Sequence, residues 1–304
     1  MIRAWLPYDD AVERMGGLPD GVEVDVFTGE GDVPDSIESV EFYVLPYMFG
    51  LEPLRLMSRM PSLRVAQTLT AGVDEYRALL PPGVTLCNAR GVHDASTAEL
   101  AVALMLASLR GIGGFARAQA RGEWAHARHE ALADKTVLIV GYGAVGAAVD
   151  ARLAGFECTV LRVARQAREG VADPSELPRL LPLADVVVLT VPMTAQTDGM
   201  VDAAFLAAMR TGALLVNVAR GAVVDSDSLL AELSSGRLRA ALDVVTPEPL
   251  PSGHPLWQAP GLLLSPHVGG NTSAFLPRAM RLVRDQLGRY CRGEPLVNVI
   301  TGDY

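Results

Sequence analysis

Residues 137–146 read VLIVGYGAVG, and this stretch decides the fold. An apolar, β-rich run is followed by Gly141, Gly143 and Gly146 at GxGxxG spacing, directly before a helical pattern. The first glycine allows a tight turn, the second lets the backbone approach a pyrophosphate, and the third lets helix and strand pack closely. Because 29 of 304 residues are glycine, the spacing alone is a weak signal. The strand before it and the helix after it are what predict a dinucleotide-binding turn.

The strand expected next, CTVLR at 158–162, ends where such units usually carry an acid for the ribose hydroxyls. Arg162 occupies that position, Arg165 follows three residues later, and no carboxylate lies between Glu157 and Glu169. A guanidinium can pair bidentately with a 2′-phosphate, so we expect NADP(H) to be favoured over NAD(H). In the alternative, both arginines are solvated surface residues and the backbone holds NAD.

Short β-rich runs alternate with helical patterns along most of the chain, which predicts an α/β fold with parallel sheets and crossover helices. The strands expected in the first third are IRAWLP, VEVDVF, FYVLP, LRVAQTLT and VTLCN. From Thr136 onward they are TVLIV, CTVLR, DVVVLTV, ALLVNV, AALDV and LLLS. Continuous apolar runs such as DVVVLTV suit strands that are covered on both faces.

The expected helices include one near 51–60 and a long one that runs from about Ser96 to 122, with Glu99 completing a capping box. Apolar residues surround most of this long helix, which predicts that it is buried. The stretch SLLAELSSG predicts a helix capped by Asp225 or Ser226 and ended by Gly236. FLPRAMRLVRDQLGRYCRG predicts a terminal helix, and EPLVNVI after it predicts an edge strand.

Charge and cysteine content argue against several classes of function. A net charge of -9 and a pI near 5.1 speak against nucleic acid or an anionic membrane as partner. Cys87, Cys158 and Cys291 are far apart and form no CxxC pair, so we expect buried thiols rather than disulfides or a metal site. The sequence shows no secretory leader pattern and no apolar run long enough to span a bilayer, so we expect a cytoplasmic protein.

Three polar residues follow successive expected strands. Arg220 follows LLVNV, Glu248 follows AALDV in DVVTPEPLP, and His267 follows LLLS. Ligands of open α/β sheets bind beyond the carboxyl ends of the strands, so these residues belong to the functional edge. Reduction of a 2-keto acid needs a cation for the carboxylate, an acid for the carbonyl oxygen, and a group that keeps this acid protonated. Taken singly, each residue is more often a surface or structural one, but their joint placement favours catalysis.

Four stretches in this order, GYGAVG, NVARGAVVD, ALDVVTPEPLPSGHPLW and LSPHVGGNT, resemble the D-isomer-specific 2-hydroxyacid dehydrogenases. An arginine at the position of Arg162 is similar to the glyoxylate/hydroxypyruvate reductase-like branch of this family. The resemblance extends over nearly the whole chain through three further stretches, TLTAGVDEY, STAELAVALMLA and RYCRGEPLVNVI. The resemblance implies a Rossmann nucleotide-binding domain at 94–272, inserted into a flavodoxin-like substrate domain made of 1–93 and 273–304. It also implies a homodimer that uses the helix near 97–119.

The resemblance further implies how substrate is held and protonated. Arg220 would bind the substrate carboxylate and carbonyl, together with the backbone amides of Ala71 and Gly72. His267 would be the general acid in reduction, and Glu248 would bond its other ring nitrogen and raise its pKa. The residues that would wall the substrate pocket, unless they are ordinary core residues at a strand end, are Tyr47, Met48 and Phe49.

Cofactor contacts are also implied by the resemblance. Asp243 matches the family position that contacts the nicotinamide carboxamide. Thr97 matches a position beside the nicotinamide ring, and Pro192 matches a position that lies against the adenosine. The other implied contacts, beside the glycines and arginines of the turn, are Ala144, Val145, Thr197, Val218, Ala219 and Gly269.

The expected activity is therefore D-specific hydride transfer between NADP(H) or NAD(H) and a small 2-keto or 2-hydroxy acid. Two alternatives stay open. The chain could oxidise phosphite or a formate-type anion, or it could be a nucleotide-sensing protein resembling the C-terminal-binding corepressors. The acidic pI and the lack of tail-like sequence speak against the second alternative.

Overall fold

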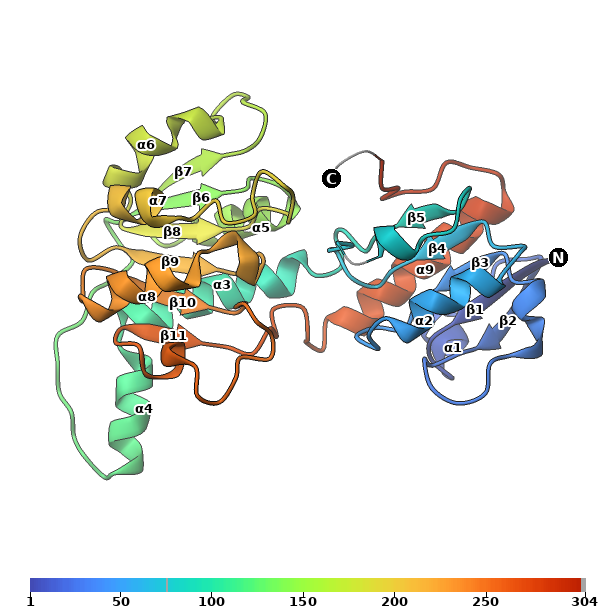
Figure 1. The fold of residues 1–304 in the computed structure, drawn as a ribbon, viewed down its shortest axis with the longest axis horizontal. Coiled ribbons are helices and arrows are strands. Elements are labelled where there is room, and N and C mark those ends of the chain that lie inside the picture. The colour runs from blue at the N-terminus through green and yellow to red at the C-terminus, as the bar shows by residue number, and fades with distance from the viewer. Residues whose placement is uncertain (75, 302–304) are drawn as a thin grey trace. The chain divides into compact units, whose positions relative to one another are not determined.

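The structure is a computed structural model that describes residues 1–74 and 76–301. The chain forms two compact units: Met1–His93 with the C-terminal stretch from Thr272, and Asp94–Asn271. Each unit has its own parallel sheet with helices on both faces (Figure 1). The predicted α/β class, with two doubly wound parallel-sheet domains, is confirmed.

The first unit is built on a five-stranded sheet. Its strands are β1 (Ile2–Leu6), β2 (Val22–Val26), β3 (Phe42–Val44), β4 (Val65–Gln67) and β5 (Thr85–Cys87). Its helices are α1 (Ala11–Met15), α2 (Glu52–Arg55), α9 (Phe275–Cys291) and the 3₁₀ turns η1 (Asp35–Glu38), η2 (Leu56–Arg59) and η3 (Arg77–Leu79). The order β2-β1-β3-β4-β5, parallel throughout, is the flavodoxin-like order. Because side chains alternate along a strand, Phe42 and Val44 pack with α1 and α9, whereas Tyr43 packs with α2 and η2.

The second unit is built on a six-stranded sheet in the order β11-β10-β9-β8-β6-β7, again parallel. Its strands are β6 (Thr136–Val140), β7 (Thr159–Val163), β8 (Val186–Leu189), β9 (Leu214–Asn217), β10 (Arg239–Leu242) and β11 (Leu262–Leu264). Its helices are α3 (Asp94–Leu109), α4 (Ile112–Ala120), α5 (Ala144–Leu153), α6 (Leu177–Leu180), α7 (Ala203–Ala208) and α8 (Ser226–Ser234). Its 3₁₀ turns are η4 (Pro174–Glu176), η5 (Leu181–Leu183), η6 (Gly221–Val223) and η7 (Pro255–Gln258).

The two faces of this sheet are covered by different helices. Ile139 and Val188 pack with α3 and α5, whereas Leu138 and Val187 pack with α6, α7 and α8. The chain leaves β6 toward β7 on one side and continues through β8 on the other. The point between β6 and β8, where the strand order reverses, is where open α/β sheets bind their ligands.

The prediction of one long helix from Ser96 to 122 is wrong in one respect, because the helix is broken after Leu109. Gly111 adopts a left-handed φ of 65°, and α3 and α4 are bent by 67° at this point. The helix also begins at Asp94, two residues before the expected start, so Ser96 and Glu99 both lie inside it. Within the described part of the chain, no single helix has the length and hydropathy of a membrane span, and only the bent pair α3 and α4 together meets the criterion.

The expected edge strand EPLVNVI is not formed. Val299 makes one isolated antiparallel bridge to Cys87, next to Asn298 with a φ of 56°. The left-handed residue turns the chain away and prevents a longer ladder. The helix over SLLAELSSG is present as α8, and the side chain of Asp225 accepts from the backbone nitrogen of Ser228 at 2.8 Å, as expected of its cap.

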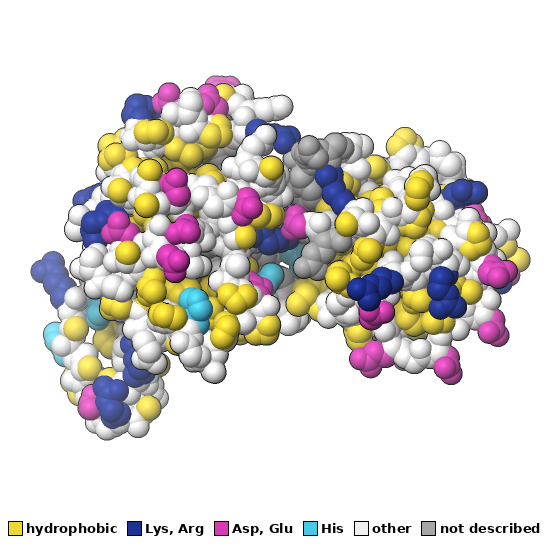
Figure 2. Space-filling view, in the orientation of Figure 1, with side chains coloured by type: hydrophobic (Ala, Val, Ile, Leu, Met, Phe, Trp, Pro, Cys, Tyr) yellow, Lys and Arg dark blue, Asp and Glu magenta, His cyan; other side chains and the backbone are white. Residues whose placement is uncertain are grey.

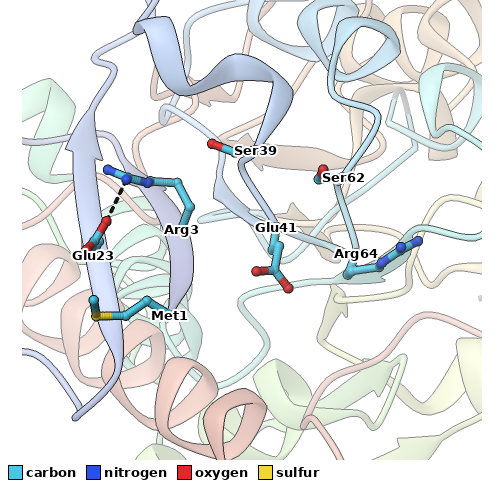
Figure 3. A pocket seen from close by; sticks show the side chains of 7 residues that line it. All are labelled: Met1, Arg3, Glu23, Ser39, Glu41, Ser62 and Arg64. Atoms are coloured by element: carbon cyan, nitrogen blue, oxygen red, sulfur yellow. Dashed lines mark ion pairs between the residues drawn. The ribbon is translucent and has the colours of Figure 1, made fainter.

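A surface hollow of about 360 Å³ lies at the amino ends of β1, β2, β3 and β4 in the first unit (Figure 3). Arg3 forms an ion pair with Glu23 across part of it, and the other lining residues are Met1, Ser39, Glu41, Ser62 and Arg64. Ligand sites of parallel sheets form at the opposite, carboxyl ends of the strands. We therefore assign no ligand to this hollow.

Candidate functional site

The glycine turn joins β6 to α5 and packs against the end of β8. Gly141 has a φ of 106°, and a Cβ there would lie 2.5 Å from the backbone nitrogen of Val191. A Cβ at Gly146 would lie 2.5 Å from the carbonyl oxygen of Gly141. At Gly143, before the first residue of α5, a Cβ would meet no atom of the described residues within 4 Å. Two glycines thus permit close packing, and the third leaves the helix N-terminus open to an anion, which fits a pyrophosphate.

Arg162 lies beside this turn, near the end of β7. The carbonyl oxygen of the next residue, Val163, accepts from the backbone nitrogens of Gly141 and Tyr142, both at 2.9 Å. The Nε and Nη2 atoms of Arg162 donate to the two carboxylate oxygens of Asp150 at 2.8 and 3.0 Å. The hydroxyl of Tyr142 donates to the same carboxylate. The arginine expected to meet the cofactor therefore already has an acidic partner, supplied by α5.

The electrostatics of this cluster follow from its contacts. Burial opposes the charge on Asp150, but hydrogen bonds from Arg162 and Tyr142 outweigh it and leave the pKa of its carboxyl below its usual value. The hydrogen bond to Asp150 also raises the pKa of Arg162. A second guanidinium lies next to the cluster, because Arg168 donates its Nη2 to the carbonyl oxygen of Tyr142 at 2.7 Å. The guanidinium carbon of Arg168 is 5.5 Å from the centre of the Tyr142 ring.

His267 and Glu248 form a hydrogen-bonded pair beyond β11 and β10. The Nδ1 atom of His267 lies 2.6 Å from one carboxylate oxygen of Glu248, and the other oxygen accepts from the backbone nitrogen of Val245 at 2.9 Å. The bond to Glu248 raises the pKa of His267 although burial and the charge of Arg220 oppose it. Burial disfavours the charge on Glu248, but the bonds from His267 and Val245 outweigh it and lower the pKa of that carboxyl. The bond to Glu248 thus favours the protonated form of the imidazole.

The loop that carries His267 is held by Asp243, at the end of β10. The backbone of His267 is left-handed, with a φ of 53°, which costs a residue with a Cβ about 1–2 kcal/mol. The carboxylate of Asp243, which is 3% exposed, accepts from the backbone nitrogens of Val268 and Gly269 at 3.0 and 2.9 Å and from the hydroxyl of Ser265 at 2.6 Å. These bonds maintain the strained conformation and fix the direction of the imidazole.

Arg220 follows β9, directly before η6. Its Nη1 donates to the carbonyl oxygen of Ala219 at 2.8 Å, and its charge lowers the pKa of both Glu248 and His267, so it lies within electrostatic range of the pair. A Cβ at the next residue, Gly221, would lie 1.9 Å from the carbonyl oxygen of Val245. The Arg220 turn and the loop of Glu248 therefore touch, and only glycine fits between them. The structure brings together all three residues that sequence analysis placed at strand ends.

The remaining predicted cofactor residues also lie in the second unit. Thr97, on α3, lies beside Gly269, since a Cβ at Gly269 would be 3.4 Å from its side chain. The hydroxyl of Thr197 donates to the carbonyl oxygen of Pro192 at 2.6 Å and so closes the loop after β8. The others flank the sheet edge, namely Ala144 and Val145 in the first turn of α5, and Val218 and Ala219 after β9. Their contact with a cofactor stays a prediction.

The predicted substrate residues Ala71, Gly72, Tyr47 and Met48 lie in the first unit. The carbonyl oxygens of Ala71 and Gly72 accept from Asn88 at 2.7 Å and from Thr70 at 2.8 Å, which orders this turn. The ring of Tyr47 lies 4.3 Å from that of Phe275 and belongs to the edge of the core. Met48 is 68% exposed, with a left-handed φ of 64°, and Phe49 lies over Gly29.

Sequence reasoning missed Asp150, Tyr142 and Arg168. An acid partner was expected only near Arg162 in the chain, whereas Asp150 lies 12 residues earlier, on a helix. A signal was available, because Asp150 lies four residues after Gly146, one helical turn along α5. Within residues 1–74 and 76–301, no three or more His, Cys, Asp or Glu side chains gather into a group able to hold a metal ion.

Comparison with known proteins agrees with this geometry. The family model for the D-isomer specific 2-hydroxyacid dehydrogenase, NAD binding domain, matches residues 102–269, almost the whole second unit. A relative named glyoxylate/hydroxypyruvate reductase B, from Yersinia pestis, is 34% identical over 260 residues, which cover 80% of this chain and 76% of the relative.

Two solved structures cover nearly all of the chain. A D-isomer specific 2-hydroxyacid dehydrogenase from Xanthobacter autotrophicus, in complex with NADPH and MES, is similar with a TM-score of 0.83 and 30% identity, over 99% of this chain and 98% of that one. An NAD-dependent formate dehydrogenase from Staphylococcus aureus, in complex with NAD, is similar with a TM-score of 0.76 and 25% identity, over 100% and 99% of the two chains.

Proposed function

Because this chain belongs to the D-isomer specific 2-hydroxyacid dehydrogenases and is thus an oxidoreductase, we propose that it reduces a small 2-keto acid of the glyoxylate or hydroxypyruvate type. The product is the D-2-hydroxy acid. The observation that carries the proposal is the bonded His267–Glu248 pair, with the charge of Arg220 acting on both. The name of the Yersinia relative supports the substrate class.

His267 is the proton donor in this proposal. Its Nδ1 is engaged by Glu248, so the proton passes from Nε2 to the carbonyl oxygen of the substrate. The nicotinamide coenzyme, when bound, supplies the hydride that adds to the carbonyl carbon. Hydride and proton together convert the keto group to a hydroxyl. In the reverse direction, neutral His267 accepts the proton, and Glu248 stabilises the imidazolium that results.

Arg220 binds the substrate carboxylate. A guanidinium offers two parallel N–H donors to a carboxylate, which also fixes the orientation of the bound acid. The backbone amides of Ala71 and Gly72, with Tyr47 and Met48, are the substrate-binding residues that we propose within the first unit. Asp243 and Thr97 lie at the nicotinamide end, because Asp243 supports the His267 loop and Thr97 lies beside Gly269.

NADP(H) is the coenzyme we propose. Arg162, Arg165 and Arg168 follow one another at the end of β7, where the adenosine ribose of a dinucleotide is held. The bound NADPH of the Xanthobacter relative supports this preference, whereas the NAD of the formate dehydrogenase shows that both coenzymes occur among similar proteins.

A homodimer formed through α4 is part of the proposal. Figure 1 shows α4 projecting from the rest of the second unit, and in Figure 2 hydrophobic and basic side chains lie side by side on this projection. Ile112 and Phe115 on α4 are 51% and 37% exposed, and Trp124 after it is 95% exposed. Large apolar side chains gathered on one projection favour a contact with another protein, here a second copy of the chain.

Steady-state kinetics test the proposed activity. Purified protein is assayed with glyoxylate, hydroxypyruvate, phenylpyruvate, formate and phosphite, each with both coenzymes. We expect the highest kcat/KM for glyoxylate or hydroxypyruvate with NADPH. We also expect His267→Ala to lower kcat by at least about 100-fold, the usual contribution of a general acid. Higher turnover of formate or phosphite would favour the anion-dehydrogenase alternative, and coenzyme binding without any turnover would favour a nucleotide sensor.

A further inference from the structure

Every nitrogen of the Arg162 guanidinium has an acceptor within the second unit. Nε and Nη2 donate to Asp150, and Nη1 donates to the carbonyl oxygen of Val160 at 3.3 Å. The side chains of Arg162 and Asp150 are only 32% and 16% exposed. Because the pair is bidentate and partly shielded from water, its positive and negative charges largely cancel at the rim of the glycine turn.

Asp150 is held in place on its other side as well. The Tyr142 hydroxyl donates to it, and Tyr142 belongs to the glycine turn itself. The backbone nitrogen of Tyr142 in turn donates to Val163, the residue after Arg162. The turn, α5 and the end of β7 are thus joined by one network, whose acidic member is Asp150.

Arg168 differs from Arg162 in this respect. It is exposed, and its Nη2 donates to a neutral acceptor, the carbonyl oxygen of Tyr142. A hydrogen bond to a neutral carbonyl leaves the positive charge of Arg168 uncancelled. The bonds to the Asp150 carboxylate, in contrast, largely cancel the charge of Arg162. The loop that carries Arg168 folds back on β7, since Ala172 donates to the carbonyl oxygen of Arg162 at 2.9 Å.

We propose that Asp150 is a specificity-determining residue of the coenzyme site, which restrains binding of a 2′-phosphate by neutralising Arg162. The preference for the phosphorylated coenzyme then depends on Arg168. Replacement of Asp150 by the neutral isostere Asn frees the charge of Arg162 for the phosphate. This inference rests on the proposed function, because it assumes that the site binds NADP(H).

Calorimetric titration with NADPH, NADH, adenosine 2′,5′-bisphosphate and AMP tests the inference. Asp150→Asn is expected to lower the Kd of NADPH and of the bisphosphate by about three- to tenfold, the range for unmasking one partly exposed charge, with little change for NADH and AMP. Asp227→Asn is the matched control, because it removes the same charge from an exposed position on α8 in the same unit. Thermal unfolding of each variant shows whether it is folded.

A second variant identifies the charge responsible. In Asp150→Asn with Arg162→Gln, the gain for NADPH is expected to disappear, which returns the Kd to within about twofold of the parent protein. An unchanged or higher Kd of NADPH in folded Asp150→Asn would overturn the inference, since Asp150 would then be neutral or would orient Arg162 for the phosphate. If the parent protein bound neither coenzyme, the proposed function itself would fail, which is a distinguishable result.

Discussion

The chemistry of this protein depends on pairs of side chains rather than on single ones. The protonated form of His267 is favoured because Glu248 accepts from its Nδ1, and Arg162 is neutralised because Asp150 faces it. In both pairs the partner changes the charge state or the effective charge of the residue that would meet a ligand. Substitution of the partner is therefore the sharpest test of each role.

Glu248→Gln is expected to shift the pH dependence of reduction. The pKa of His267 is raised in the folded protein, so the imidazolium persists to higher pH and the rate falls as pH rises through that pKa. Removal of the carboxylate lowers the pKa of His267, so the fall in rate should occur at lower pH. The measurement is kcat/KM against pH, with Glu176→Gln, on a distant exposed turn, as control. An unshifted profile would count against the role of Glu248.

Arg162→Asp is expected to weaken NADPH binding. The substitution removes the cation that neutralises Asp150 and places a second carboxylate where the 2′-phosphate is expected. Two like charges about 6–10 Å apart, at an effective dielectric constant of about 20, repel each other by about 1.7–2.8 kcal/mol. The KM for NADPH should rise about 10- to 100-fold, while that for NADH changes little. Initial rates at varied coenzyme concentration measure both KM values. An unchanged KM for NADPH would show that the end of β7 does not belong to the coenzyme site.

At the scale of elements, glycines decide where turns and helices meet. Gly221 lets the Arg220 turn touch the loop that carries Glu248, and Gly111 lets the chain turn between α3 and α4. The first glycine is required by close approach and the second by a left-handed φ. These two causes predict different consequences of substitution by alanine.

Gly221→Ala is expected to lower both stability and activity. Its Cβ would lie 1.9 Å from the carbonyl oxygen of Val245, so the Glu248 loop must move. Overpacking of this kind costs about 1–3 kcal/mol, and displacement of Glu248 should also reduce kcat. Thermal unfolding and steady-state rates are the measurements. Gly253→Ala is the control, because its Cβ would have open space among the described residues, and equal effects of the two changes would contradict this explanation.

Gly111→Ala is expected to destabilise the second unit by about 1–2 kcal/mol, the cost of a left-handed residue with a Cβ. The new Cβ would also lie 2.3 Å from the ring of His129. Gly114→Ala, inside α4 and without close neighbours, should instead stabilise by about 0.5–1 kcal/mol through helix propensity. Urea unfolding of both variants measures the difference, and the same sign for both would show that the φ of Gly111 is not the cause.

At the scale of the whole molecule, each unit has a complete core of its own, and each sheet is covered on both faces. The projecting α4 and the exposed residues 121–131 after it are not part of these cores. A segment this exposed gains its stabilisation from a partner if it is to keep a fixed conformation. This reasoning agrees with the proposed dimer.

Phe115→Ser combined with Trp124→Ser is expected to convert the dimer to a monomer at micromolar concentration. The change removes two large exposed apolar side chains and leaves both cores intact. Light scattering coupled to size-exclusion chromatography measures the mass. Leu183→Ser, which alters a residue with 52% exposure elsewhere in the second unit, should leave the dimer unchanged. A parent protein that is already monomeric would refute the proposal.

Local patterns were sufficient to predict the eleven strands found among the described residues and the three residues at strand ends. Alternation and apolar runs depend on residues that are near one another in the chain, and the carboxyl ends of parallel strands necessarily share one edge. The edge strand EPLVNVI was predicted wrongly, since the left-handed Asn298 interrupts it. The break at Gly111 was missed because glycine inside an apolar helical pattern is compatible with both a continuous and a broken helix.

The sequence by itself determined the glycine turn, the parallel α/β class and the residue types available at the sheet edge. These follow from short-range sterics and from the periodicity of burial. Only the tertiary structure decided which charges meet. Asp150 faces Arg162 because α5 packs across the sheet beside β7, and that packing depends on contacts between residues far apart in the chain. The packing of the whole molecule therefore decides which charged side chains pair with each other. This pairing sets how strongly each charged side chain acts on a ligand.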